Sequence, residues 1–163
     1  WDFSEIEKIH AVARDHNLGF HLDGARLWNA LVAKGETPEQ YGKLFDTISV
    51  CLSKGLGCPV GSVLVGNQET IHNALRIRKI FGGGMRQAGY LAAAGLYALE
   101  NNIERLKEDH ARARKIGAVL KKLSFVGDIR PIKTNILIFD VKAPFTAASF
   151  LEKIELVLVN CLV

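Results

Sequence analysis

Short, β-rich apolar runs alternate with segments of helical periodicity along this sequence, and no other feature limits the fold as strongly. Three β-rich runs stand at residues 18–23 (LGFHLD), 46–52 (DTISVCL) and 62–66 (SVLVG). Apolar residues recur at helical spacing in the segments around them, at 4–16, 25–35, 37–45 and 67–81. Strands that alternate with helices predict an α/β fold with a sheet that is at least partly parallel.

The same alternation continues to the end of the sequence. Two helices are expected within residues 88–123, followed by a strand at 135–141, a helix at 145–154 and a strand at 155–160. Three residues are expected to cap helices: Ser4, Gly35 and Asn67.

A change of composition near Asn101 marks the expected domain boundary. The alanine-rich segment AGYLAAAGLYALE precedes it, and the strongly charged run IERLKEDHARARK follows. We therefore expect residues 1–101 to belong to one domain and residues 102–163 to a second.

Charge and composition exclude several classes of function. The net charge is only +4, and no basic stripe is interleaved with aromatic residues, so nucleic-acid binding is not expected. No apolar run approaches the length of a membrane span. Cys51, Cys58 and Cys161 lack metal-ligand spacing and are expected to be reduced thiols, which indicates a cytoplasmic protein.

Both ends of the sequence are unusual for a complete domain. It begins in a helical segment that no strand precedes, and it ends on the apolar run LVLVNCLV. Complete domains rarely end on an exposed apolar run without a polar cap. We therefore expect the chain to be a piece of a longer protein.

Lys54 stands alone among small and apolar residues in the run CLSKGLGCPVG. An ammonium is costly to bury, so one interpretation is a loop lysine whose charge reaches water. The other is a lysine that forms a Schiff base with a carbonyl compound, with Gly55 and Gly57 leaving room for a flat ring and Ser53 donating to a phosphate. The glycine spacing resembles a dinucleotide-binding fingerprint only loosely, and no helix follows it, so that interpretation fails.

Asp23 follows an apolar strand in HLDGAR and precedes Gly24. Ligands bind at the carboxyl ends of strands in open α/β sheets, so Asp23 is a candidate site residue; the alternative is the N-cap of the helix that follows. Arg26 is either a surface residue or a two-donor clamp for a carboxylate. His21 and Asp23 could form a metal pair, but no further ligands are nearby in the sequence, so no metal site is expected.

The run RKIFGGGMRQ contains three consecutive glycines after a helical segment. Successive backbone N–H groups of such a run can bind an anion, and Arg86 would add a charged donor. The alternative is a helix C-cap followed by a turn. Together, these residues are the set that pyridoxal phosphate requires. A lysine binds its aldehyde, an aspartate pairs with its ring nitrogen, and arginines bind the cofactor phosphate and the substrate carboxylate.

The segments HLDGARLWNA, SVCLSKGLGCPVGSVLVG and RKIFGGGMRQAGYLAAAGLYALENN resemble the low-specificity threonine aldolases. These are pyridoxal-phosphate enzymes of the β-eliminating lyase superfamily, with the aspartate-aminotransferase fold (fold type I). The resemblance extends over about residues 4–154. It implies that the chain holds part of the mixed sheet of the large domain and the start of the small α+β domain, without the family's N-terminal half and C-terminal end.

The same resemblance implies roles for individual residues. Lys54 is the Schiff-base lysine, Asp23 pairs with the pyridine nitrogen of the cofactor, and Arg26 binds the substrate carboxylate. Arg86 and Lys79 match basic residues near the cofactor phosphate, with Arg86 reaching it across a subunit interface. A homodimer or homotetramer with a shared site is therefore implied.

The implied reaction is the cleavage of L-threonine or L-allo-threonine into glycine and acetaldehyde by retro-aldol chemistry. The resemblance places the general base in the part of the family's sequence that is absent here. A different pyridoxal-phosphate lyase or an aminotransferase would share Lys54 and Asp23, and an inactive truncated piece is a further alternative.

Overall fold

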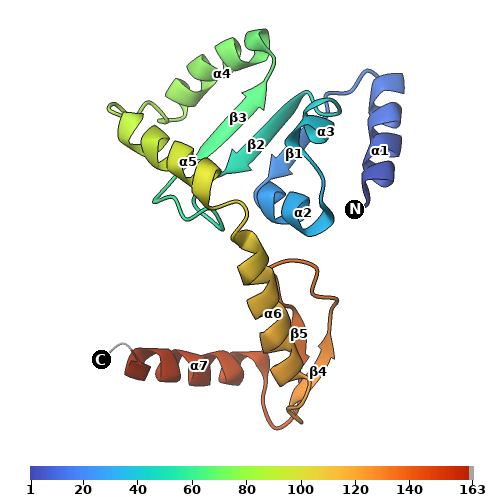
Figure 1. Ribbon diagram of the computed structural model, residues 1–163, viewed down its shortest axis with the longest axis vertical. Helices are drawn as coiled ribbons and strands as arrows, with labels where there is room; N and C mark the ends of the chain where they lie inside the picture. The colour runs from blue at the N-terminus through green and yellow to red at the C-terminus, as the bar shows by residue number, and fades with distance from the viewer. Residues whose placement is uncertain (162–163) are drawn as a thin grey trace. The chain divides into compact units, whose positions relative to one another are not determined.

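The computed structural model describes residues 1–161, with side chains described through Glu155, and it divides into two compact units (Figure 1). The first unit is Trp1–Leu106, and the second begins at Lys107. The expected assignment of residues 1–101 and 102–163 to the large and small domains of a longer protein stays a prediction.

The first unit contains a mixed three-stranded sheet and five helices. In chain order its elements are α1 (Phe3–Asp15), β1 (His21–Gly24), α2 (Leu27–Lys34), α3 (Pro38–Gly42), β2 (Thr47–Cys51), β3 (Ser62–Gly66), α4 (Gln68–Ile80) and α5 (Gly89–Asn101). Strand β1 pairs parallel with β2, and β2 pairs antiparallel with β3. The predicted α/β class and the partly parallel sheet are therefore confirmed.

The core of the first unit lies on one face of this sheet. Burial alternates along β2, where Ile48 and Val50 are buried, as expected for a strand with one covered face. They pack against Leu27 and Leu31 of α2 and Tyr41 of α3, and Figure 1 shows these helices beside the sheet. Full burial of one such apolar side chain contributes about 1.5–3 kcal/mol, so this cluster stabilises the packing of α2 and α3 on the sheet.

Local signals set several of the helix ends. Asn67 accepts a hydrogen bond from the Thr70 backbone N–H at 2.8 Å and caps α4, as predicted. Gly35 ends α2 in the left-handed region, at φ 68°, also as predicted. The prediction that Ser4 caps α1 is wrong. Asp2 is the N-cap, because the Asp2 N–H donates to the Glu5 carboxylate at 2.9 Å in a capping box that starts two residues earlier.

The second unit consists of a two-stranded antiparallel sheet and two helices. Its elements are α6 (Leu106–Leu120), which starts at the boundary, β4 (Val126–Ile129), β5 (Phe139–Val141) and α7 (Ala147–Cys161). Four phenylalanine rings pack together here, with centroids of contacting rings 5.1–5.9 Å apart in edge-on or tilted orientations. Phe150 of α7 contacts Phe125 and Phe139, and Phe125 also contacts Phe145. This aromatic cluster joins α7 to the small sheet.

Two predictions in the second unit need correction, and one strand was not predicted. The strand predicted at 155–160 is wrong, because α7 continues through Cys161. A short apolar run does not distinguish strand from helix, and extending an existing helix needs no new nucleus. The strand predicted at 135–141 is shorter, at Phe139–Val141, and β4 was not predicted at all.

No helix among the described residues is long and apolar enough to cross a membrane.

Asp46 connects three segments of the first unit. Its carboxylate accepts a hydrogen bond from Arg14 at the end of α1 at 2.8 Å and another from the Phe20 N–H before β1 at 2.7 Å. Its own N–H donates to the Phe20 carbonyl at 2.8 Å. These two hydrogen bonds to the carboxylate, chiefly the one from Arg14 and then the one from Phe20, hold the pKa of the Asp46 carboxyl below its ordinary value.

Asp46→Asn is expected to lower the free energy of unfolding at neutral pH by about 0.5–1 kcal/mol, the range of an exposed ion pair with a hydrogen bond. Because the folded state favours the carboxylate, this stabilisation is present above the ordinary carboxyl pKa and is lost as the pH falls through the lower pKa of the folded state. Urea unfolding at several acidic pH values should therefore show a flatter pH dependence in the variant.

The matched control is Asp15→Asn, which removes the same charge from an exposed aspartate that forms no ion pair among the described residues. An equally flattened pH dependence in Asp15→Asn would contradict the role assigned to Asp46.

Candidate functional site

The ends of the two parallel strands form one edge of the sheet in the first unit. In the register of β1 and β2, Asp23 lies opposite Ser49 and Gly24 opposite Val50. Lys54 follows the end of β2 by three residues. Parallel strands leave a sheet at the same edge, so the Asp23 carboxylate and the loop that carries Lys54 emerge side by side. Ligands of α/β sheets bind at this kind of edge.

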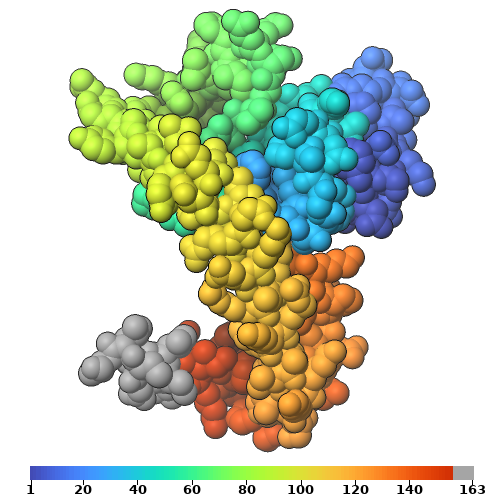
Figure 2. All heavy atoms as spheres, viewed as in Figure 1, coloured from blue at the N-terminus to red at the C-terminus, as the bar shows by residue number. Residues whose placement is uncertain are grey.

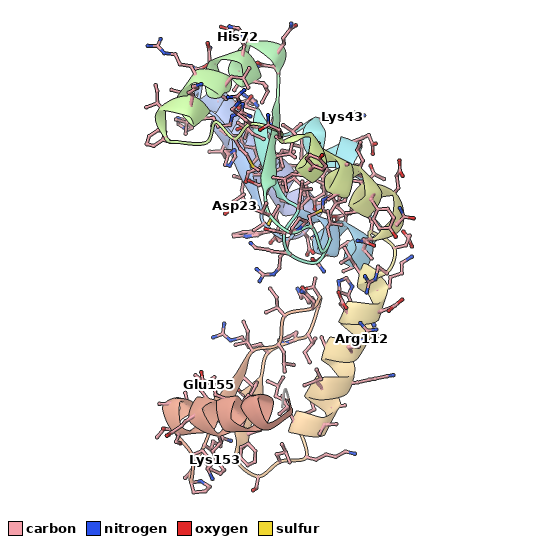
Figure 3. All side chains as sticks on the ribbon, turned by 90° about the vertical axis from the view of Figure 1, so that its left-hand side faces the viewer. Asp23, Lys43, His72, Arg112, Lys153 and Glu155 are labelled. Carbon is pink, nitrogen blue, oxygen red and sulfur yellow. The ribbon has the colours of Figure 1, made fainter. Side chains whose placement is uncertain are left out.

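Asp23 stands on the face of the sheet opposite to the apolar core. On the same face the His21 Nδ1 and the Thr47 Oγ1 are 2.7 Å apart, and Ser49 continues the polar row along β2. The Asp23 side chain, labelled in Figure 3, is exposed. Polar side chains on this face fit a ligand site better than a second helix layer.

One oxygen of the Asp23 carboxylate is fixed by the chain itself. The Oδ1 atom accepts a hydrogen bond from the Ala25 N–H at 3.1 Å. The alternative role of Asp23 as helix N-cap is wrong, because α2 begins at Leu27 with Arg26 at the N-cap position. The second carboxylate oxygen forms no hydrogen bond among the described residues and is available to a ligand.

The loop after β2 has a buried base and an exposed lysine. The Leu52 N–H donates to the Gly61 carbonyl at 3.0 Å, and the Cys58 N–H donates to the Leu52 carbonyl at 3.1 Å. Leu56 is 2% exposed and Cys58 is buried, whereas the Lys54 side chain is exposed and forms no ion pair within the described part of the chain. This geometry agrees with both interpretations of Lys54, the hydrated loop lysine and the Schiff-base lysine, because an exposed amine is hydrated and also open to reaction.

Gly55 has a different role from the predicted one. A Cβ atom at this position would lie 2.8 Å from the Leu106 Cδ2 and 3.1 Å from the Asn29 Oδ1, and both of these residues are buried. The absence of a side chain at Gly55 therefore lets the loop pack against the protein rather than leaving room for a ring. Gly57 is required for its backbone conformation, at φ 75°.

Arg26 and Ser53 lie close in the sequence to Asp23 and Lys54, respectively. Arg26 is exposed three residues after Asp23, and Ser53 is exposed directly before Lys54. The Ser53 Oγ lies 3.6 Å from the Cys51 Sγ. The guanidinium of Arg26 forms no ion pair among the described residues, so its donors are available to an anion.

The glycine run after α4 acts as a helix end. The Gly82 N–H donates to the Lys79 carbonyl at 3.1 Å, and the Gly83 N–H donates to the Arg78 carbonyl at 2.8 Å. The alternative of a helix C-cap is therefore confirmed, and the prediction that successive glycine N–H groups bind an anion is wrong for these two. Lys79 and Arg86 are exposed, and no hydrogen bond or ion pair within the described residues joins them to Asp23 or Lys54.

Two asparagines near the lysine loop did not enter the sequence analysis as site residues. Asn29 of α2 is buried next to Gly55, and Asn102, directly after α5, donates to the Leu56 carbonyl at 2.7 Å. The sequence carried no signal for Asn29, and near Asn102 it showed only the change of composition at Asn101. No group of three or more metal-ligating side chains occurs among residues 1–155.

Curated relatives of this chain include low-specificity L-threonine aldolases from bacteria and plants. The chain is 48% identical over 143 residues to the "Low specificity L-threonine aldolase" of Escherichia coli (strain K12), a match that covers 88% of this chain and 42% of that protein. It is 42% identical over 137 residues to "Low-specificity L-threonine aldolase 1" of Arabidopsis thaliana, a match that covers 83% of this chain and 38% of that protein. The chain therefore spans about two fifths of the length of the relatives it matches.

Solved structures show the same fold. A crystal structure of an aromatic amino acid beta-eliminating lyase/threonine aldolase from Exiguobacterium sp. 255-15 matches with a TM-score of 0.75 and 27% identity, over 84% of this chain and 39% of that one. A crystal structure of an L-allo-threonine aldolase from Listeria monocytogenes EGD-E matches with a TM-score of 0.73 and 27% identity. This match covers 83% of this chain and 38% of that one. The fold type expected from the sequence is confirmed.

The family comparison agrees with the relatives and with the fold. Residues 1–144 match the beta-eliminating lyase family, which is most of the chain. This chain belongs to the β-eliminating lyase family.

Proposed function

We propose that this chain is the lysine-bearing part of a pyridoxal-phosphate lyase that cleaves L-threonine or L-allo-threonine into glycine and acetaldehyde. The observation that carries the proposal is the parallel pairing of β1 with β2, which brings Asp23 and the Lys54 loop to one edge of the sheet. The names of the relatives support the substrate class.

The donors at this edge fit pyridoxal phosphate. The Lys54 amine would hold the cofactor covalently at its aldehyde carbon, and the free oxygen of Asp23 would keep a proton on the pyridine nitrogen. When bound, the cofactor supplies an electron sink for cleavage of a bond to the α-carbon of an amino acid. The Ala25 N–H holds the Asp23 carboxylate in place, so little reorganisation is needed as charge develops.

Arg26 would bind the substrate carboxylate through its planar pair of donors. Two parallel hydrogen bonds fix an orientation as well as a position. Arg26 would thereby fix both the position and the orientation of the substrate at the site before a bond to its α-carbon is cleaved. Ser53, adjacent to Lys54, would donate its hydroxyl to the cofactor phosphate.

Arg86 would reach the cofactor phosphate from a second subunit, and Lys79 would be a second basic residue near that phosphate. Both are exposed and form no ion pair among the described residues. The apolar side chains beside them are also exposed, at Ile77, Ile80, Phe81 and Met85. Figure 2 shows α4 and α5 on the surface of the first unit. Such exposed apolar groups are typical of an interface, which supports a homodimer or homotetramer.

A cytoplasmic location completes the proposal. Cys51 and Cys58 are both free thiols, as the reducing cytoplasm maintains them.

The test uses a chimera, because the chain covers 42% of the E. coli relative. The matching segment of that relative is replaced by this chain, and two signals are measured: the visible absorption of lysine-bound cofactor and the release of acetaldehyde from L-threonine. We expect both signals in the chimera. Lys54→Ala should abolish the visible band, and Asp23→Asn should keep the cofactor but lower kcat by about 10²-fold or more, the loss typical of one preorganised electrostatic group.

The matched control is Lys43→Ala, an exposed lysine of the same unit, labelled in Figure 3, which should leave both signals unchanged. A chimera that binds the cofactor but releases no acetaldehyde would refute the proposed reaction. A visible band that persists in Lys54→Ala would refute the assignment of Lys54.

Arg26→Lys in the same chimera is expected to raise KM for L-threonine by about 10-fold or more, because a compact ammonium cannot replace two parallel donors worth roughly 1.5–3 kcal/mol each. Steady-state kinetics give KM and kcat separately. An unchanged KM would mean that another residue binds the carboxylate.

A further inference from the structure

A single side-chain hydrogen bond joins the end of α5 to the lysine loop. The Asn102 Nδ2 donates to the Leu56 carbonyl at 2.7 Å, and the two residues are 46 positions apart in the sequence. The bond is partly buried, and Leu56 itself is 2% exposed.

The position of this bond relative to Lys54 gives it a specific effect. The Gly57 N–H donates to the Lys54 carbonyl at 2.9 Å and closes a turn over residues 54–57. Leu56 is the third residue of that turn, and Asn102 holds its carbonyl. The backbone of Lys54 is therefore connected to α5 through only one turn, although the Lys54 side chain is exposed.

Packing around the turn leaves it little freedom on the buried side. Leu56 and Cys58 form an apolar cluster with Ala98 of α5, and the Cys58 Sγ lies 3.6 Å from the Ala94 carbonyl oxygen. A Cβ atom added at Gly55, in the same turn, would lie only 2.8 Å from the Cδ2 atom of the buried Leu106. Apolar packing alone is not directional, whereas the hydrogen bond from Asn102 determines how the peptide group of Leu56 is oriented.

The neighbouring residue Asn101 provides a natural comparison. Its Nδ2 donates to the Tyr97 carbonyl at 2.8 Å, within its own helix and exposed to solvent. The two asparagines thus have the same side chain, adjacent positions and nearly the same bond length. Of these two hydrogen bonds, only the one from Asn102 reaches the lysine loop.

We propose that Asn102 is a positioning residue that holds the turn of Lys54 in the conformation from which its amine reacts. The inference rests on the proposed function of Lys54. A lysine amine is carried by a flexible four-carbon stem, so the backbone at its base sets the volume it can reach. Without the bond to Leu56, the turn would occupy several conformations, and the effective concentration of the amine at the cofactor would fall.

The experiment compares Asn102→Ala and the isosteric Asn102→Asp with the control Asn101→Ala, first in the 163-residue chain. Hydrogen exchange is measured on peptides that cover residues 52–58 and, for comparison, β1 and β2. We expect faster exchange over 52–58 in both Asn102 variants, unchanged exchange in the strands, and no change in Asn101→Ala. Asn102→Asp keeps the shape but cannot donate, so it separates loss of the hydrogen bond from loss of volume.

The second readout is the site of cofactor attachment in the chimera. Borohydride reduces the C=N bond that forms, with loss of water, between a lysine amine and the aldehyde of pyridoxal phosphate, and leaves a stable secondary amine. Mass spectrometry then gives the fraction trapped on Lys54 over time. We expect trapping on Lys54 to be slower by about 10-fold or more in both Asn102 variants and unchanged in Asn101→Ala. The KM for L-threonine should change little, because no hydrogen bond or ion pair among the described residues joins Asn102 to Arg26.

The outcomes separate the two proposals. If the unsubstituted chimera traps no cofactor on Lys54, the proposed function fails, and hydrogen exchange over 52–58 still tests whether Asn102 holds the turn. If the unsubstituted chimera traps cofactor on Lys54 and Asn102→Asp does so at the same rate as Asn101→Ala, the positioning role of Asn102 is refuted. Unchanged exchange over 52–58 in Asn102→Asp would refute it as well.

Discussion

The parallel pairing of β1 with β2 is the contact on which the rest of the first unit depends. Side chains alternate along a strand, so this one register places Ile48 and Val50 in the core and Asp23 on the opposite, polar face. Parallel strands also end at the same edge, which brings the Asp23 carboxylate next to the loop of Lys54. A shift of the register by one residue would exchange the two faces and destroy both the core and the site.

The lysine loop combines an exposed reactive group with a fixed base. Its apolar residues Leu56 and Cys58 pack against α5, its glycine at 55 contacts buried protein atoms, and its turn is closed by hydrogen bonds. The amine thus extends into solvent from a backbone that the core holds in place. Sites built on such supported segments maintain their geometry better than sites on unsupported loops.

Sequence patterns predicted the elements whose signals are local. Strand β3 occupies the predicted residues 62–66, and α4 begins after Asn67 and ends near the glycine run, because capping and turn residues act within a few positions. The run 155–160 was predicted as a strand and is part of α7, because a short apolar run has no strand-specific signal. The functional reason assigned to Gly55 was also wrong, since its close contacts, Leu106 and Asn29, lie far away in the sequence.

The amino-acid sequence alone was sufficient for the α/β class, for the chemical types of the candidate site residues and for the resemblance to a family, because these depend on composition and short-range spacing. Only the folded chain showed that Asp23 lies opposite Ser49, that Gly82 and Gly83 complete a helix end, and that Asn102 reaches Leu56. Strand register and contacts between distant residues result from the packing of the whole unit. No local pattern encodes a hydrogen bond between residues 46 positions apart, and for that reason only the tertiary structure could reveal it.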